Sequence, residues 1–158
     1  MKQINRFLKI GLVLAILGAG YFFTSLTIFD RTLIQLNTSQ KLSYIPFENK
    51  LNMQCDKADN LVPKLASSRF HLITWNVHKG QDTGWQEDLE RLSKRADFVL
   101  LQEATQHQNL STFSTALFVS SFSFNELLSG VKTFTQTQPE WYCGGGVAEP
   151  LIQIPKVA

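Results

Sequence analysis

The chain of 158 residues carries 15 basic and 13 acidic side chains, a formal net charge of +2, and 44% hydrophobic residues. This length leaves room for one domain at most, and the hydrophobic content excludes wholesale disorder. The near-neutral charge provides no electrostatic argument for nucleic-acid binding. Two cysteines without a C-x-x-C spacing argue against a disulfide scaffold and against a zinc knuckle.

The N-terminal segment predicts a membrane anchor. Residues 1–9 form a basic flank without an acid, and residues 10–29 follow without a charge. About 20 apolar residues at helical rise match the hydrocarbon core of a bilayer. The basic flank favours a cytoplasmic N-terminus with the remainder exported. A cleaved signal peptide is the competing interpretation, because small residues at 18–20 follow a short apolar core, and the protein would then be secreted.

Residues 30–68 are predicted to form a linker, because neither a helical nor a strand period persists there. Cys55 lies in this segment. An oxidising exported compartment would allow it to form a disulfide with Cys143, and two unpaired thiols are the alternative.

The central stretch predicts a strand, an amphipathic helix and a second strand. Residues 70–76 are rich in β-branched and aromatic side chains and end on Asn76. Thr83 and Gln86 have the spacing of a capping box that opens the helix. Residues 98–103 begin with a continuous apolar run, which is typical of a buried strand. Two strands in this order, joined by a helix, predict a parallel pair.

The pattern after residue 104 is less regular. It predicts one further helix, at residues 105–117, and a flexible break at the glycine run of residues 144–146. The remaining predicted strands lie at residues 116–124, 132–135, 141–143 and 151–154.

Asn76 and Glu103 are the polar pair that the sequence places at the carboxyl ends of the two predicted parallel strands. Ligands bind at this edge of open α/β sheets. A carboxylate there suits Mg²⁺, and an amide beside it could hold phosphate or orient the carboxylate. The alternative is that Asn76 caps a turn and Glu103 is a solvated loop residue. His78 and Lys79 are weaker candidates for phosphate binding, with solvent-facing loop residues as the alternative.

Two short motifs carry a resemblance to a known family. TWNV at residues 74–77, followed by DFVLLQEA at residues 97–104, resembles the start of the endonuclease/exonuclease/phosphatase (deoxyribonuclease I-like) superfamily. The resemblance implies that Glu103 ligates Mg²⁺ or Mn²⁺ and that Asn76 helps to position the metal and the scissile phosphate. It also implies an α/β (α+β) fold in which residues 69–158 form half of a four-layer α/β/β/α sandwich, and it is closest to a bacterial branch of the family. Together with the predicted anchor, this places the chain in a bacterial inner membrane with the C-terminal part in the periplasm.

The sequence departs from that family in one respect. It contains neither a G-D-x-N nor an S-D-H motif, in which the family carries its general base and its terminal histidine. We therefore expect a truncated phosphoric ester hydrolase with little or no activity as it stands. The substrate of a complete member would be a phosphodiester or phosphomonoester in nucleic acid, lipid or sugar phosphate, and no obligate protein partner is inferred. The alternative is a non-catalytic, membrane-tethered remnant or interaction protein.

Overall fold

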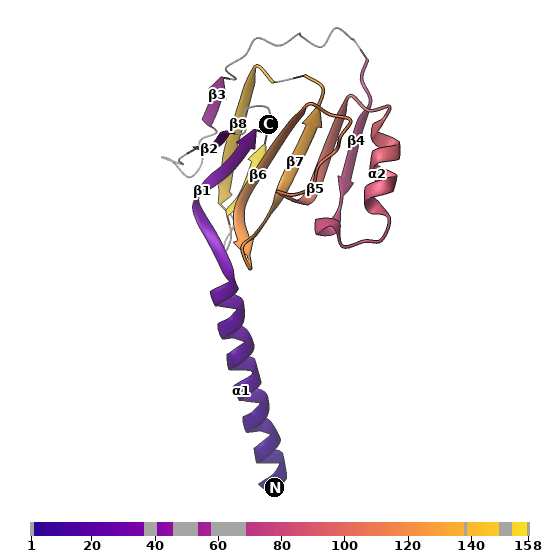
Figure 1. Ribbon diagram of the computed structural model, residues 1–158. Coiled ribbons are helices and arrows are strands. Elements are labelled where there is room, and N and C mark those ends of the chain that lie inside the picture. Colours follow the sequence, from indigo (N-terminus) through magenta and orange to yellow (C-terminus); the bar gives the residue numbers. More distant parts are fainter. Residues whose placement is uncertain are drawn as a thin grey trace.

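The chain folds as a mixed α/β protein with a long N-terminal helix. The computed structural model describes residues 2–36, 41–45, 54–57, 69–137, 139–148 and 153–157. Helix α1 (Lys2–Ser25) projects from one end of a β-sheet body (Figure 1). The body holds a six-stranded sheet in the order β2-β1-β6-β7-β5-β4 and a three-stranded sheet in the order β3-β8-β9. The remaining elements are β1 (Leu26–Leu36), β2 (Lys41–Ile45), β3 (Gln54–Lys57), β4 (Leu72–Asn76), η1 (His78–Gly80), α2 (Trp85–Ser93), β5 (Phe98–Thr105), β6 (Thr115–Phe124), β7 (Leu127–Thr135), β8 (Trp141–Ala148) and β9 (Gln153–Val157).

Helix α1 is long and apolar enough to cross a membrane from Arg6 to Ser25, and none of this span is buried against the rest of the described chain. It ends four residues before the predicted boundary at residue 29. The residues after Ser25 are β-branched or aromatic at several positions, and they pair with β6 from Leu26 opposite Phe124. Strand pairing therefore overrides the hydropathy that made residues 26–29 look like a continuation of the helix.

The prediction of a linker at residues 30–68 is wrong for the described part of that segment. β1 runs on to Leu36 and lies inside the six-stranded sheet, between β2 and β6. Ile34 is fully buried opposite Val119. β3 also falls in this segment, and its Cys55 forms a disulfide with Cys143 on β8, with an S–S distance of 2.07 Å. β2, also in this segment, pairs with β1. Residues 37–40, 46–53 and 58–68 of the predicted linker lie outside the described residues.

The central strand–helix–strand unit forms as the sequence predicts, with one local difference. β4 and β5 are parallel neighbours, and Asn76 lies opposite Gln102. α2 begins after Gly84, which is left-handed (φ 78°), and no side chain among the described residues caps it. The predicted capping box is therefore wrong. Gln86 instead donates from Nε2 to Glu90 Oε1 and to the carbonyl of Asn109.

The helix predicted at residues 105–117 is also wrong. β5 continues to Thr105, turns follow, and β6 begins at Thr115. β6 and β7 form an antiparallel hairpin whose pairing runs from Thr115 to Phe124, so the Phe- and Ser-rich sequence is used as strand. The glycine run at residues 144–146 is part of β8, between β3 and β9, and is not a break.

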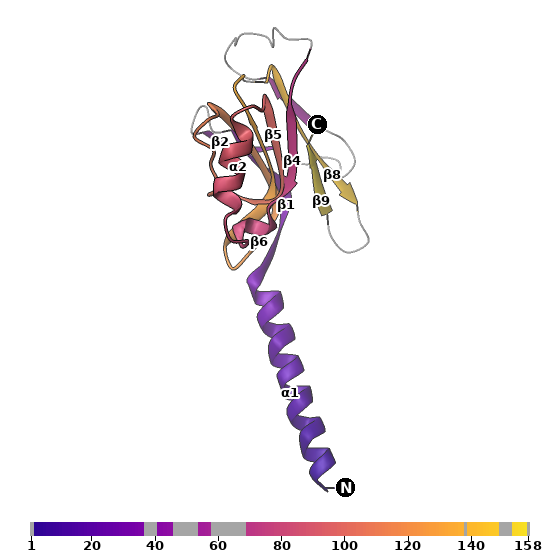
Figure 2. The ribbon, with the colours of Figure 1, turned by 90° about the vertical axis from the view of Figure 1, so that its right-hand side faces the viewer.

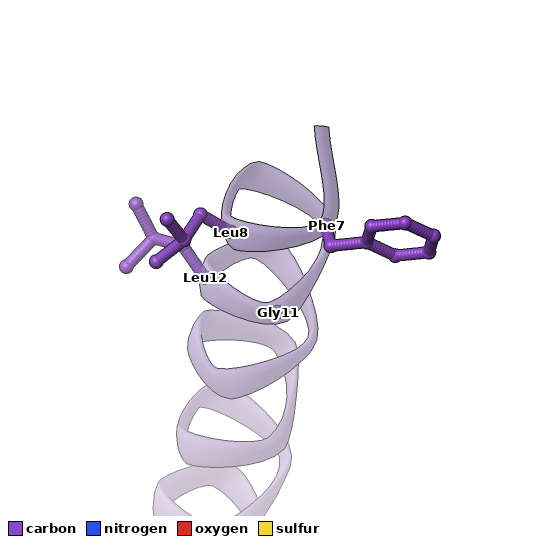
Figure 3. A pocket seen from close by; sticks show the side chains of 4 residues that line it. All are labelled: Phe7, Leu8, Gly11 and Leu12. Carbon is purple, nitrogen blue, oxygen red and sulfur yellow. The ribbon is translucent and has the colours of Figure 1, made fainter. Parts of the chain in front are cut away.

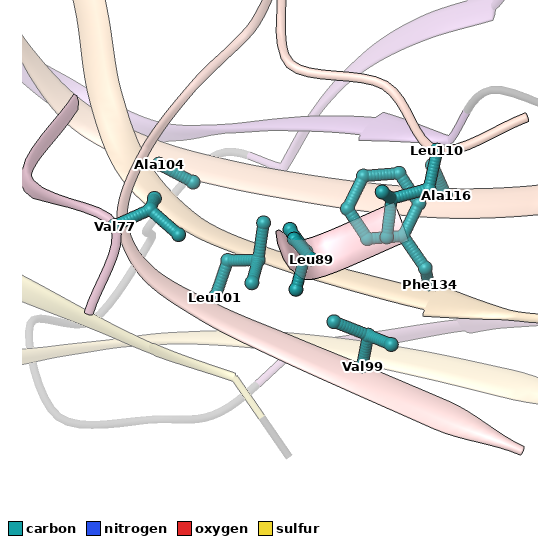
Figure 4. Packing of buried hydrophobic residues seen from close by; sticks show 8 residues of the cluster. All are labelled: Val77, Leu89, Val99, Leu101, Ala104, Leu110, Ala116 and Phe134. Atoms are coloured by element: carbon teal, nitrogen blue, oxygen red, sulfur yellow. The ribbon is translucent and has the colours of Figure 1, made fainter. Parts of the chain in front are cut away.

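The larger apolar cluster lies between the six-stranded sheet and α2 (Figure 4). Figure 2 shows α2 on one side of this sheet and β8 and β9 on the other. A second, smaller cluster holds Ile34 and Val119, with Leu117 and Val131 packed against it. The buried members of the larger cluster are Val77, Leu89, Val99, Leu101, Ala104, Leu110, Ala116 and Phe134.

Candidate functional site

The two residues singled out by the sequence are in direct contact in the structure. Asn76 is the last residue of β4, and its Nδ2 donates a hydrogen bond of 2.9 Å to Glu103 Oε1. Glu103 lies in β5 where the pairing with β7 shifts register between Leu101 and Ala104. A bulge of this kind redirects a side chain that would otherwise continue the alternation of the strand. Both side chains are exposed at the carboxyl edge of the sheet.

The amide of Asn76 is fixed from both ends. Its Oδ1 accepts a hydrogen bond of 3.0 Å from the backbone N–H of His78, while Nδ2 faces the carboxylate of Glu103. The reverse orientation of the amide would place an oxygen against the carboxylate and an NH₂ group against a donor. The orientation therefore follows from the network. The Oδ1 of Asn76 closes the turn, as the alternative predicts, and its Nδ2 contacts Glu103. The two interpretations of Asn76 are therefore compatible.

Three non-glycine residues around this contact have left-handed backbones: His78 (φ 45°), Lys79 (φ 57°) and Glu103 (φ 48°). Such a conformation costs a non-glycine residue about 1–3 kcal/mol, and it gathers at binding and catalytic sites. The first two belong to η1, directly after β4. The hydrogen bond from Asn76 to Glu103 therefore joins two strained segments, the turn at His78 and Lys79 and the bulge at Glu103.

His78 and Lys79 are exposed, which agrees with the alternative of solvent-facing residues, and phosphate binding by them stays a prediction. His78 Nδ1 lies 3.5 Å from Asp82 Oδ1, so the structure pairs this imidazole with Asp82. Among the described residues, no group of three or more His, Cys, Asp or Glu side chains is placed to hold a metal ion. Glu103 is the carboxylate that contacts Asn76 at this edge.

Lys132 on β7 supports the segment that follows Glu103, and the sequence reasoning did not single it out. Its Nζ donates to the carbonyls of Gln106, at 3.0 Å, and Gln108, and lies over the rings of Phe118 and Phe134. Burial lowers the pKa of Lys132 to about 8. A lysine two residues before Phe134 in an apolar strand is the available signal, but an exposed strand face would give the same pattern.

Gln108 completes this support. Its Oε1 accepts from the backbone N–H of Thr105 at 3.0 Å. Its buried Nε2 lacks a hydrogen-bond partner among the described residues and would lie 3.0 Å from a Cβ placed on Gly80. The turn after β4 and the segment after β5 are therefore packed closely, and the distance between Asn76 and Glu103 is held by their surroundings.

A pocket also lies on α1, lined by Phe7, Leu8, Gly11 and Leu12 (Figure 3). It is a depression in the surface of the apolar helix, and its lining offers no side-chain polar group. In a bilayer this surface would be covered by acyl chains. It is not a candidate for chemistry.

Comparisons with known proteins identify relatives that carry a family name only. No protein-family profile and no solved structure matches the chain. A UPF0294 protein of Klebsiella pneumoniae is 31% identical over 101 residues, covering 61% of this chain and 38% of the relative. A UPF0294 protein of Photorhabdus laumondii is 27% identical over 123 residues, covering 72% of this chain and 47% of the relative. A UPF0294 protein of Yersinia pestis is 32% identical over 111 residues, covering 66% of this chain and 43% of the relative.

These relatives correct the resemblance drawn from the sequence. The chain matches UPF0294 proteins and no endonuclease/exonuclease/phosphatase profile, so the assignment to that superfamily is wrong. Two stretches at strand ends, residues 74–77 and 97–104, carried that assignment, and strand-end patterns this short are shared by many α/β proteins. The chain spans less than half the length of these relatives, and it is similar to the UPF0294 proteins.

Proposed function

We propose that the carboxyl edge of β4 and β5 is one part of a divalent-cation-dependent site for phosphate esters, held at a membrane by α1. The observation that carries the proposal is the 2.9 Å hydrogen bond from Asn76 Nδ2 to Glu103 Oε1. It fixes a carboxylate at the edge where α/β sheets bind ligands. The left-handed backbone of Glu103 belongs to the bulge opposite β7, and a bulge of this kind re-aims a side chain next to a site.

The donor set fits a hydrated hard cation. Mg²⁺, or Mn²⁺ in its place, is bound in proteins by one or two carboxylates together with waters and phosphate oxygens of the ligand. Glu103 would supply the carboxylate, and Asn76 would hold it in one orientation, as outer hydrogen bonds do for metal ligands. A bound cation would neutralise charge on phosphoryl oxygens and favour an activated water.

Ester hydrolysis also needs a group that takes the proton of the attacking water. Within the described residues, His78 is the imidazole nearest in sequence to Asn76, and it is paired with Asp82. An imidazole paired with a carboxylate can act as a general base, which contributes about 10²–10⁴ in rate. We nevertheless propose that this chain turns substrate over slowly or not at all, because no group of three metal-ligating side chains is found among the described residues. The activity and substrate of the longer relatives, and a four-layer α/β/β/α sandwich of which this body would be half, are parts of the same proposal.

α1 would act as a single-pass anchor in a bacterial inner membrane, with the sheet body in the periplasm. The hydropathy and length of the Arg6–Ser25 span support this. The disulfide between Cys55 and Cys143 supports an oxidising compartment.

The test uses the purified full chain in detergent micelles. Titration calorimetry with Mg²⁺ and Mn²⁺ measures binding, and bis(p-nitrophenyl) phosphate and p-nitrophenyl phosphate measure turnover. We expect Glu103→Gln to abolish cation binding and Asn76→Ala to weaken it by about tenfold. Glu126→Gln is the matched control, because Glu126 is also exposed and left-handed (φ 65°). Equal cation affinity in the native chain and in Glu103→Gln would refute the proposal.

A non-catalytic, membrane-tethered binding protein is the second candidate. It is favoured by the single carboxylate, since no three-ligand group is found among the described residues. Cation binding that depends on Glu103, with no turnover of either ester, would support this candidate. Turnover that disappears in Glu103→Gln would support the hydrolase.

A further inference from the structure

The candidate site and the membrane helix lie at the same edge of the six-stranded sheet. Asn76 is at the carboxyl end of β4, which is parallel to β5. β5 is antiparallel to β7, and its carboxyl end reaches the start of β7, with Thr105 opposite Ser129. The turn between β6 and β7 is therefore at this edge, as is Leu26, the first residue of β1. Figure 1 shows η1 and the β6–β7 turn at the end of the body from which α1 leaves.

The β6–β7 turn packs against the last turn of α1. Asn125 Nδ2 donates to the Tyr21 hydroxyl, and the Asn125 backbone N–H donates to the carbonyl of Ser25, both at 2.9 Å. The ring of Phe124 lies 6.5 Å from that of Tyr21 and 6.0 Å from that of Phe22. Tyr21 precedes the helix end by four residues, about 6 Å along the axis. The turn thus lies beside the end of the apolar span and not above it.

The side chains at this junction suit the interface of a bilayer. Phe124 and Leu127 are each 37% exposed, next to Tyr21 and Phe22, which are 60% and 49% exposed. Tyrosine and tryptophan at the end of an apolar span mark the headgroup level of a membrane, and Tyr21 has this position. Lys79, Asp82, Glu103 and Glu126 give this edge charges of both signs. Apolar contact, and not attraction to anionic lipid, is therefore the force that would hold the turn there.

We propose that this edge of the sheet faces the bilayer, with the β6–β7 turn in the headgroup region, and that the Asn76–Glu103 site takes phosphate groups presented by phospholipid headgroups. β4 is two strands away from β7, about 10 Å laterally. Along the strands, Leu101 and Ala104 pair with Lys132 and Gly130, so Glu103 lies about four to five residues, roughly 13–17 Å, from the turn. The site is therefore at the end of the body that faces the bilayer, set back from the turn. The orientation requires that α1 is inserted in a bilayer, and the headgroup assignment also rests on the function proposed above.

The orientation is tested in phosphatidylcholine vesicles with variants of the full chain that each carry one added cysteine and keep the native disulfide. The disulfide leaves the introduced thiol as the reactive one, because the chain holds no other cysteine. A fluorophore on Leu127→Cys is expected to be quenched severalfold more by headgroup nitroxide lipids than one on Gln136→Cys. Gln136 is exposed beyond the other end of β7 and is the matched control. Equal quenching at the two positions would overturn the orientation.

The headgroup assignment is tested separately by Mn²⁺ binding to the same proteoliposomes. We expect binding that depends on Glu103 to be severalfold tighter with phosphatidic acid in the vesicles than with soluble glycerol phosphate added to phosphatidylcholine vesicles. Equal enhancement by the soluble phosphate would refute the headgroup assignment and leave the proposed function in place. Mn²⁺ binding that is unchanged in Glu103→Gln would refute both the proposed function and the headgroup assignment. The orientation of the sheet is decided separately, by the quenching experiment.

Discussion

Lys132 provides a sharp test of how the segment after Glu103 is held. The side chain is 6% exposed, and burial lowers its pKa from 10.5 to about 8. Because the folded pKa is below the unfolded one, the unfolded chain binds more protons between these two values. The free energy of unfolding should therefore rise with pH in this window. Well below pH 8 the lysine is protonated in both states, and its contribution is constant.

The size of the effect follows from the two pKa values. Between about pH 7 and about pH 9.5 the full shift would add roughly 2 kcal/mol to the free energy of unfolding. Two carbonyls, of Gln106 and Gln108, accept from Nζ and favour the charged form, so they oppose part of the desolvation. We therefore expect a gain of about 1–2 kcal/mol.

The assay is urea unfolding of the full chain in detergent at several pH values, followed by tryptophan fluorescence. Trp75 and Trp85 pack against the larger apolar cluster and report on its loss. Lys132→Met keeps most of the apolar stem and removes the titrating group, so its stability should lack the rise. Lys94→Met, at an exposed position after α2, is the control and should keep it. Parallel pH profiles for the native chain and Lys132→Met would refute the reasoning.

Two further predictions concern the framework. Gly130→Ala should destabilise the chain by about 3 kcal/mol or more, because its Cβ would lie 1.9 Å from the carbonyl oxygen of Val119. Gly20→Ala, which meets nothing within 4 Å, should leave the urea midpoint unchanged or raise it, and a similar loss in both variants would contradict the packing argument. Removing the disulfide with Cys55→Ser/Cys143→Ser should cost about 2–5 kcal/mol, since it closes a sequence separation of 88 residues. An unchanged midpoint in that double variant would show that the three-stranded sheet does not contribute to the measured unfolding.

The sequence was sufficient for elements whose signal is local. β4, α2 and β5 are adjacent in the chain, and hydrophobic periodicity identified all three. The contact between Asn76 and Glu103 followed from this, because parallel strands bring their carboxyl ends together. The side-chain geometry did not follow. The register shift in β5 and the left-handed backbone of Glu103 arise from pairing with β7, a partner about 30 residues away in the chain.

Elements with distant partners were missed. The sequence pattern predicts a linker where residues 30–36 form the second part of β1, because no period persists there, yet Ile34 is buried opposite Val119. Residues 105–117 were interpreted as helix, and their C-terminal part pairs with β7 as strand. Tertiary pairing overrides a weak local preference in both cases. Lys132 was missed for a related reason, since its burial depends on β6 and on the segment after Glu103.

The most consequential of these differences is the missing linker, because it changes what the membrane helix does. A flexible tether over residues 30–68 would have let the sheet body sample many orientations above the bilayer. In the structure β1 follows α1 without an intervening residue, and β1 pairs with both β2 and β6 in the sheet. Asn125 adds a second attachment through Tyr21 and Ser25. Two attachments on neighbouring strands resist rotation about either one. In the orientation proposed above, the helix therefore determines which edge of the sheet faces the bilayer, and that edge carries Asn76 and Glu103.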